Sequence, residues 1–196
     1  MSKLTTQETV YVTYIATTPE RCWAALTSSD FTTQYFFGRT VESDWKCGSE
    51  WIMRMPDRRV DVKGRVVESD PPRTLAITWN IDWIEEFKKL PEAIVTYEIE
   101  PIGEVVRLTM TESHPVPIPD YMLEGGRRGW PVILCGLKSL LETGRVPKIP
   151  MPQPPNRTSD HLIRLSAWLL CNHFLSTTAT KAASKLAILR GLAPKS

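Results

Sequence analysis

Two side chains near the end of one segment have residue types that could carry out proton transfer. Glu112 and His114 lie in the segment TESHP, at the expected end of a β-strand and near the mouth of any cavity beneath it. Glu112 continues the alternation of Val106, Leu108 and Met110, which would turn its carboxylate inward. A carboxylate held there could act as a general acid or base. The alternative is that the strand has twisted outward and leaves Glu112 in solvent.

The residues that could bind a metal are scattered. His114, His161 and His173 lie in different segments, and Cys171 with His173 forms only a Cys-x-His pair. Such a pair cannot complete a four-coordinate zinc site by itself. We therefore predict no metal site and no cofactor.

Motifs for nucleophilic or phosphate chemistry are also missing from the sequence. There is no G-x-S-x-G, and the glycine-rich EGGRRG lacks the lysine and the spacing of a phosphate-binding loop. Cys135 lies between Leu134 and Leu137 in an apolar helical pattern, so we expect it to be a small buried side chain. The chain is more readily understood as a binding protein than as an enzyme.

A second group of candidate residues is large and apolar. Its members fall on the expected inward faces of strands and of one helix, where they could form an ordinary core or line a pocket for a hydrophobic molecule. These candidate ligand-binding residues are Trp51, Met53, Trp79, Tyr97, Met110, Trp130, Leu134 and Leu137. In the segment 81–92, Trp83, Ile84 and Phe87 could gate the entrance or form a short amphipathic turn.

The elements that must position these residues follow from periodicity. Period-two alternation predicts strands over 39–46, 49–55, 60–69, 73–82, 93–101 and 105–113, preceded by a strand around Val10, Val12 and Tyr14. Clean alternation of this kind is typical of an antiparallel sheet with one covered face. Between the first two strands, Thr18 and Pro19 predict the start of one helix, and Asp30 is the expected cap of a second.

The cover of the sheet is the segment GWPVILCGLKSLLETG, residues 129–144. Its apolar side chains have helical spacing, Pro131 would stand in the first turn, and Gly144 would end the helix. We expect its C-terminal leucines to seal the core and its N-terminal half to contact any ligand.

Composition and charge restrict the classes of function. The chain carries a net charge of +2, but residues 147–196 contribute +6 and residues 1–146 contribute −4. An acidic body argues against nucleic-acid binding. The N-terminus has no apolar signal, no segment is long and apolar enough to span a bilayer, and the four cysteines show no paired spacing. These features predict a cytoplasmic protein with reduced thiols.

The chain divides at a proline-rich stretch. We predict a folded domain over 1–146, an extended linker over 147–159, and a basic helical extension over 160–196. The extension could dock on the domain as a helical hairpin. It could also bind a partner, be poorly ordered, or make weak contact with a membrane surface through residues 160–192.

Four segments resemble the activator of heat-shock protein 90 ATPase branch of the START-like (SRPBCC) superfamily. They are TPERCWAALTSSDFTTQYF, GSEWIMRM, GRVVESDPPRTLAITW and GGRRGWPVILCGLKSLLETG, in the family's order over about residues 8–145. The resemblance implies an α+β helix-grip (Bet v-type) fold, in which a seven-stranded antiparallel sheet wraps a long C-terminal helix.

Three functions remain open at this point. The first is a binding module for a hydrophobic small molecule or lipid held between the sheet and the closing helix. The second, implied by the resemblance, is a co-chaperone or other protein-interaction module active in the stress response, with a filled core and a functional outer surface. The third is a cyclase or lyase without metal that uses Glu112 or His114 as its acid or base.

Overall fold

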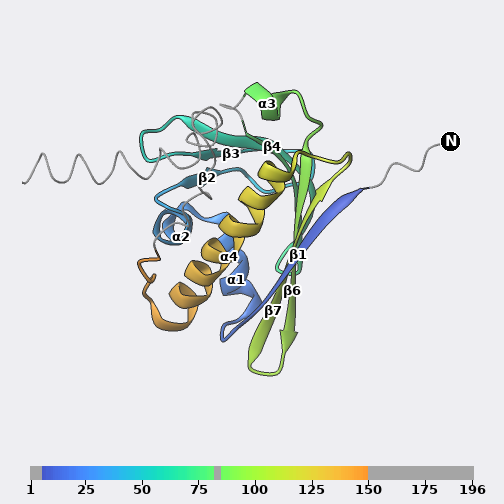
Figure 1. The fold of residues 1–196 in the computed structure, drawn as a ribbon. Coiled ribbons are helices and arrows are strands. Elements are labelled where there is room, and N and C mark those ends of the chain that lie inside the picture. Colours follow the sequence, from blue (N-terminus) through green and yellow to red (C-terminus); the bar gives the residue numbers. More distant parts are fainter. Residues whose placement is uncertain (1–5, 82–84, 150–196) are drawn as a thin grey trace, which may run out of the picture. The chain divides into compact units, whose positions relative to one another are not determined.

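The computed structural model describes residues 6–81 and 85–149. Within these ranges the chain forms seven strands and four helices (Figure 1). In chain order they are β1 (Gln7–Ile15), α1 (Pro19–Thr27), α2 (Ser29–Tyr35), β2 (Thr40–Glu42), β3 (Glu50–Arg54), β4 (Val60–Asp70), β5 (Thr74–Ile81), α3 (Glu85–Lys88), β6 (Ala93–Ile102), β7 (Val105–His114) and α4 (Asp120–Thr143).

The strands form one antiparallel sheet in the order β1-β7-β6-β5-β4-β3-β2. Consecutive strands from β2 to β7 are neighbours in the sheet, whereas α1 and α2 carry the chain from β1 at one edge to β2 at the other. Alternation along the strands puts side chains such as Val95, Tyr97 and Leu108 on the buried face. The predicted α+β helix-grip fold is therefore confirmed.

Helix α4 covers the buried face, with α1 beside it (Figure 1). Its start differs from the predicted one. The helix begins at Asp120, nine residues before Gly129, so Pro131 lies in its interior and not in its first turn. It ends as predicted at Gly144, which adopts a left-handed conformation with φ of 71°.

The position of Cys135 corrects a second prediction, because the side chain is exposed and not buried. Ile133, Leu134 and Leu137 face the core. At 100° per residue, position 135 falls on the opposite side of the helix from Ile133 and Leu137. Being flanked by leucines in the sequence does not place a residue on their helix face.

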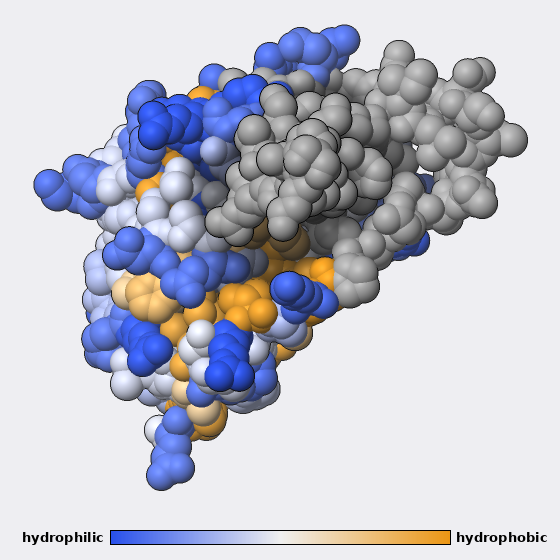
Figure 2. Space-filling view, turned by 90° about the vertical axis from the view of Figure 1, so that its left-hand side faces the viewer, coloured by the Kyte–Doolittle hydropathy of each residue, from blue (hydrophilic) through white to orange (hydrophobic). Residues whose placement is uncertain are grey.

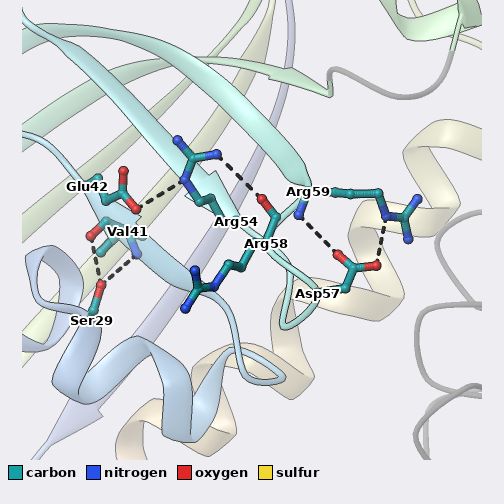
Figure 3. Close-up of polar contacts among 7 residues, drawn as sticks. All are labelled: Ser29, Val41, Glu42, Arg54, Asp57, Arg58 and Arg59. Atoms are coloured by element: carbon teal, nitrogen blue, oxygen red, sulfur yellow. Dashed lines mark hydrogen bonds and ion pairs between the residues drawn. The ribbon is translucent and has the colours of Figure 1, made fainter.

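The short helices are held by their caps and by β2. Thr18 caps α1, with its Oγ1 accepting from Arg21 N at 3.3 Å, whereas Ser28 and not Asp30 caps α2. Ser29 Oγ donates to Val41 O at 2.8 Å and accepts from Val41 N at 3.0 Å, which joins α2 to β2 (Figure 3). Figure 2 views the molecule from the left-hand side of Figure 1, where α2 and β2 lie, and shows apolar surface between hydrophilic side chains.

Several predicted features lie outside the described residues. These are nearly all of the linker 147–159, the whole extension 160–196 with its predicted membrane contact, the gating residues Trp83 and Ile84, and the side chain of Phe87. Among the described residues, no helix is long and apolar enough to cross a bilayer.

Candidate functional site

The candidate site lies where β5, β6 and β7 meet at one end of the covered face. Trp79 pairs with Ala93 and Ile94 pairs with Ser113, so the small Ala93 side chain lies in the row between Trp79 and His114. A methyl group there leaves space that a larger side chain would fill. The result is a cavity of about 50 Å³, lined by Trp79, Asn80, Ile81, Leu90, Pro91, Glu92, Ala93, Glu112, His114 and Ile118.

Glu112 lies at the end of β7 with its side chain only 14% exposed. Its Oε2 accepts a hydrogen bond from Trp130 Nε1 of α4 at 3.2 Å. A glycine in α4 makes this approach possible, because a Cβ at Gly126 would lie 2.9 Å from the same oxygen. The carboxylate is therefore held between the sheet and the closing helix.

His114 lines the cavity and is buried, with 9% of its surface exposed. Its Nε2 lies 3.5 Å from Glu112 Oε1. This approach lacks hydrogen-bond geometry, and Nε2 has no hydrogen-bond partner among the described residues. A buried polar atom in this state is a place where a ligand or water could bind.

Burial and the charge of Glu112 raise the pKa of two nearby phenols, those of Tyr11 and Tyr97. Burial raises the pKa of Tyr11 to about 12, and the charge of Glu112 contributes to the shift. The Tyr11 Oη is also buried without a hydrogen-bond partner among the described residues. Burial, and then the charge of Glu112, raises the pKa of Tyr97 well above its ordinary value. Both phenols therefore stay protonated at neutral pH and can donate hydrogen bonds.

Next to this polar group lies a cluster of aromatic rings. Trp79 contacts Trp51 with ring centroids 5.2 Å apart and Trp130 at 5.3 Å, and Phe36 contacts Trp130 at 6.1 Å. Trp51 Nε1 donates to Thr78 O at 2.9 Å, which fixes its indole. Because the rings fill the space between sheet and helix, the cavity beside them measures only about 20 Å³, room for about one water molecule.

The eight predicted ligand-binding residues divide into two groups. Trp51, Met53, Trp79 and Tyr97 line the smaller cavity, and Trp79 also lines the larger one. Met110, Trp130, Leu134 and Leu137 are buried in the hydrophobic core and line neither of these two cavities. The structure brings Glu112 and His114 together, as two of the three ionisable residues lining the larger cavity.

Sequence reasoning missed three residues that shape the site: Tyr11, Ala93 and Gly126. Only Tyr11 could have been found from the sequence, because alternation in β1 places its side chain on the face opposite to that of the exposed Val10 and Val12.

Chemically, the site offers a carboxylate, an imidazole and protonated phenols in an apolar setting, which suits hydrogen bonding and proton exchange. Among the described residues, no group of three potential ligands is close enough to hold a metal ion.

A family model describes this arrangement of sheet and closing helix. The model of the activator of Hsp90 ATPase homolog 1-like proteins matches residues 16–142. The chain belongs to this family. The match spans the chain from the end of β1 almost to the end of α4. No curated protein sequence matches the chain.

Solved structures with the same fold include three of distant sequence. Protein MLL2253 from Mesorhizobium loti has 24% identity and a TM-score of 0.58, covering 69% of this chain and 96% of that one. The Aha1 dimer from Colwellia psychrerythraea has 19% identity and a TM-score of 0.57, covering 70% and 98%. PFC0360w, an HSP90 activator from Plasmodium falciparum, has 19% identity and a TM-score of 0.51, covering 63% and 86%. Identities at this level establish the shared fold alone.

Proposed function

We propose that this family member is a binding module for a small hydrophobic molecule whose polar end lies beside Glu112 and His114. The observation that carries the proposal is the buried His114 Nε2, which lines a cavity without a hydrogen-bond partner among the described residues. Leaving such an atom unpaired costs about 1–3 kcal/mol. A ligand atom that bonds to it would recover part of that free energy.

The size of the cavity limits how the ligand sits. Pockets that enclose a whole drug-sized ligand usually measure about 300–1,000 Å³, far more than the 50 Å³ here. The polar end would therefore occupy the cavity, and the apolar body would extend along Leu90, Pro91 and Ile118. A molecule as large as a lipid would in addition require α4 to move away from the sheet.

Filling the cavity tests this proposal. Ala93→Leu places three further carbon atoms at a position that is 5% exposed, and we expect it to prevent binding. Thr111→Leu is the matched control, because Thr111 lies in β7 at the alternate position, opposite Val10 of β1 and away from the cavity. Native mass spectrometry of protein purified from cells, and titration with 1-octanol followed by tryptophan fluorescence, measure occupancy. A wild-type protein that carries no ligand and does not respond to the probe would contradict the proposal.

A second candidate function is protein interaction of the Hsp90-activator type, with a role in the stress response. It is favoured by a row of exposed apolar side chains on the edge strand β1, where Val10, Val12 and Tyr14 are 55%, 52% and 51% exposed. The family's description and the name of the Plasmodium protein point to the same class of partner. The filled aromatic core is also compatible with a function at the outer surface.

Binding to purified Hsp90 tests this candidate. The measurement is made under reducing conditions, because we predict a cytoplasmic location for the protein. We expect Val10→Lys with Val12→Lys to weaken binding in calorimetry and to remove any stimulation of the Hsp90 ATPase. Val67→Lys is the control, because Val67 is similarly exposed at 45% but lies in β4, far from β1 in the strand order. Equal binding by both variants would exclude this surface.

A further inference from the structure

The charges around the larger cavity are of one sign. Among the described residues that line it, Glu92 and Glu112 are acidic, and none is lysine or arginine. The basic residue that acts on the neighbouring Tyr11 is Arg127, which is exposed on α4 and does not line the cavity. A ligand with an anionic end would therefore meet like charge without a compensating base.

Two polar atoms beside the cavity, Glu112 Oε1 and His114 Nε2, are suited to accept hydrogen bonds from one group. Glu112 Oε2 already accepts from Trp130 Nε1, which leaves Oε1 turned toward His114 Nε2 at 3.5 Å. His114 is 91% buried, being 9% exposed, and its Nε2 is unpaired among the described residues. In a neutral imidazole with its proton on Nδ1, Nε2 is an acceptor. One nitrogen placed beside both atoms could donate to each of them.

We infer that the polar end of the ligand is a primary ammonium group carried on an apolar body, bound by Glu112 Oε1 and by His114 Nε2. This inference rests on the proposed function and names the ligand class for the same site. Hydrogen bonds from an ammonium to a carboxylate are charge-assisted and about twice as strong as neutral ones. An ammonium group also fits a cavity of about 50 Å³, since a water-sized group needs only about 10–15 Å³.

The apolar residues of the site suit the rest of such a ligand. Ile81, Leu90 and Ile118 line the same cavity as the two acidic side chains. They can cover the methylene groups next to the nitrogen, while the ammonium turns toward Glu112. A site with two hydrogen-bond acceptors, Glu112 Oε1 and His114 Nε2, next to apolar side chains suits an amine with an alkyl or aromatic body. It does not match a fatty acid, whose carboxylate would face Glu112.

Three probes whose carbon chains have the same length but whose polar ends differ test the class of ligand: octylamine, 1-octanol and octanoate. Titration near neutral pH is followed by tryptophan fluorescence and by amide chemical shifts of β6 and β7. We expect octylamine to bind about 10-fold to 100-fold more tightly than 1-octanol, as one charged hydrogen bond implies. Octanoate should bind more weakly than 1-octanol.

Variants locate the ammonium. Glu112→Gln keeps the size of the side chain and an oxygen for Trp130, and we expect it to bring octylamine and 1-octanol to within about 3-fold of each other, since the charge that separates them is gone. Glu98→Gln is the matched control, because Glu98 is exposed at an outward position of β6; it should leave the ratio unchanged. In the wild-type protein, contacts between the methylene next to the nitrogen and the Ala93 methyl should appear in nuclear Overhauser spectra, which keeps the test independent of how the variants fold.

The outcomes separate the two proposals. If 1-octanol or octanoate binds as tightly as octylamine at this site, the ammonium inference is overturned and the binding site stands. If octylamine keeps its advantage in Glu112→Gln, or shows no contact with Ala93, the ammonium lies elsewhere and the inference is likewise overturned. If none of the three probes binds, the proposed function itself fails.

Discussion

The indole Nε1 of Trp130 in α4 donates a hydrogen bond to Oε2 of Glu112 at the end of β7, over 3.2 Å. Trp130 is 6% exposed and the Glu112 side chain 14%, so this bond joins the closing helix to the last strand away from solvent. It also sets which carboxylate oxygen is left for a ligand. The packing of the helix and the chemistry of the site therefore depend on the same pair.

Removing the donor should be costly. Trp130→Phe keeps an aromatic ring against Phe36 and Trp79 but leaves Glu112 Oε2 without its indole partner. We expect the free energy of unfolding to fall by about 2–4 kcal/mol, from the unpaired carboxylate together with the smaller ring. Urea denaturation followed by circular dichroism measures it. In the Glu112→Gln background the same substitution should cost less, and an equal cost would show that the bond contributes nothing.

Two adjacent glycines in α4 should respond in opposite ways to alanine. A Cβ at Gly126 would lie 2.9 Å from Glu112 Oε2, whereas nothing lies within 4 Å of a Cβ at Gly125. Gly125→Ala should stabilise the protein by about 0.5–1 kcal/mol through helix propensity alone. Gly126→Ala should instead lower stability and change the tryptophan emission, because the carboxylate must move away from Trp130. Equal melting temperatures for the two variants would contradict the close packing of Glu112 against α4.

Those glycines also explain where the sequence was misleading. A glycine pair followed by Pro131 resembles a helix boundary, and helix propensity alone predicts a start near Gly129. The helix nevertheless begins at Asp120, since burial of Met122 and Leu123 against the domain extends it through the pair. The positions of the strands were predictable, because apolar and polar residues alternate along a strand when only one face of the sheet is covered. All seven predicted strands are present.

The candidate site shows the same division between local and non-local information. Parity with Leu108 and Met110 allowed an inward Glu112 but left a solvated one open, and the structure has the inward one, with the side chain 14% exposed. The residues that lie next to Glu112 and His114 in the folded chain could not be predicted from alternation. Ala93 lies beside His114 only because β6 pairs with β7. Gly126 reaches Glu112 only through the packing of α4. Strand register and helix placement are properties of the folded chain that periodicity does not contain.

A buried ion pair beside Phe36 and Phe37 should matter for stability. Arg39 Nε contacts Asp61 Oδ2, both residues are 4% exposed, and the Arg39 guanidinium lies 5.9 Å from the ring centroid of Phe36 and 5.8 Å from that of Phe37. Asp61→Ala would leave the guanidinium buried without this carboxylate. We expect a loss of about 3–5 kcal/mol, measured by thermal and urea denaturation.

The control for this loss is an exposed pair that joins β2 to β3. Arg54 Nε lies 3.1 Å from Glu42 Oε1, with side-chain exposures of 32% and 56% (Figure 3). Glu42→Gln should change the free energy of unfolding by no more than about 1 kcal/mol, because solvent screens such pairs. If Asp61→Ala costs no more than Glu42→Gln, the buried pair does not stabilise the fold.

The cysteines should differ sharply in their reactivity. Cys47 and Cys135 are exposed, whereas Cys22 is buried in α1 and burial raises the pKa of its thiol to about 12. Because the thiolate is the reactive form, iodoacetamide at pH 8 should alkylate Cys47 and Cys135 at least about 100-fold faster than Cys22. Peptide mass spectrometry after timed quenching measures the three rates separately, and the same reaction in urea should make them equal. Protection of Cys135 in the native protein would mean that the outer face of α4 is covered, and rapid labelling of Cys22 would mean that α1 opens readily from the sheet.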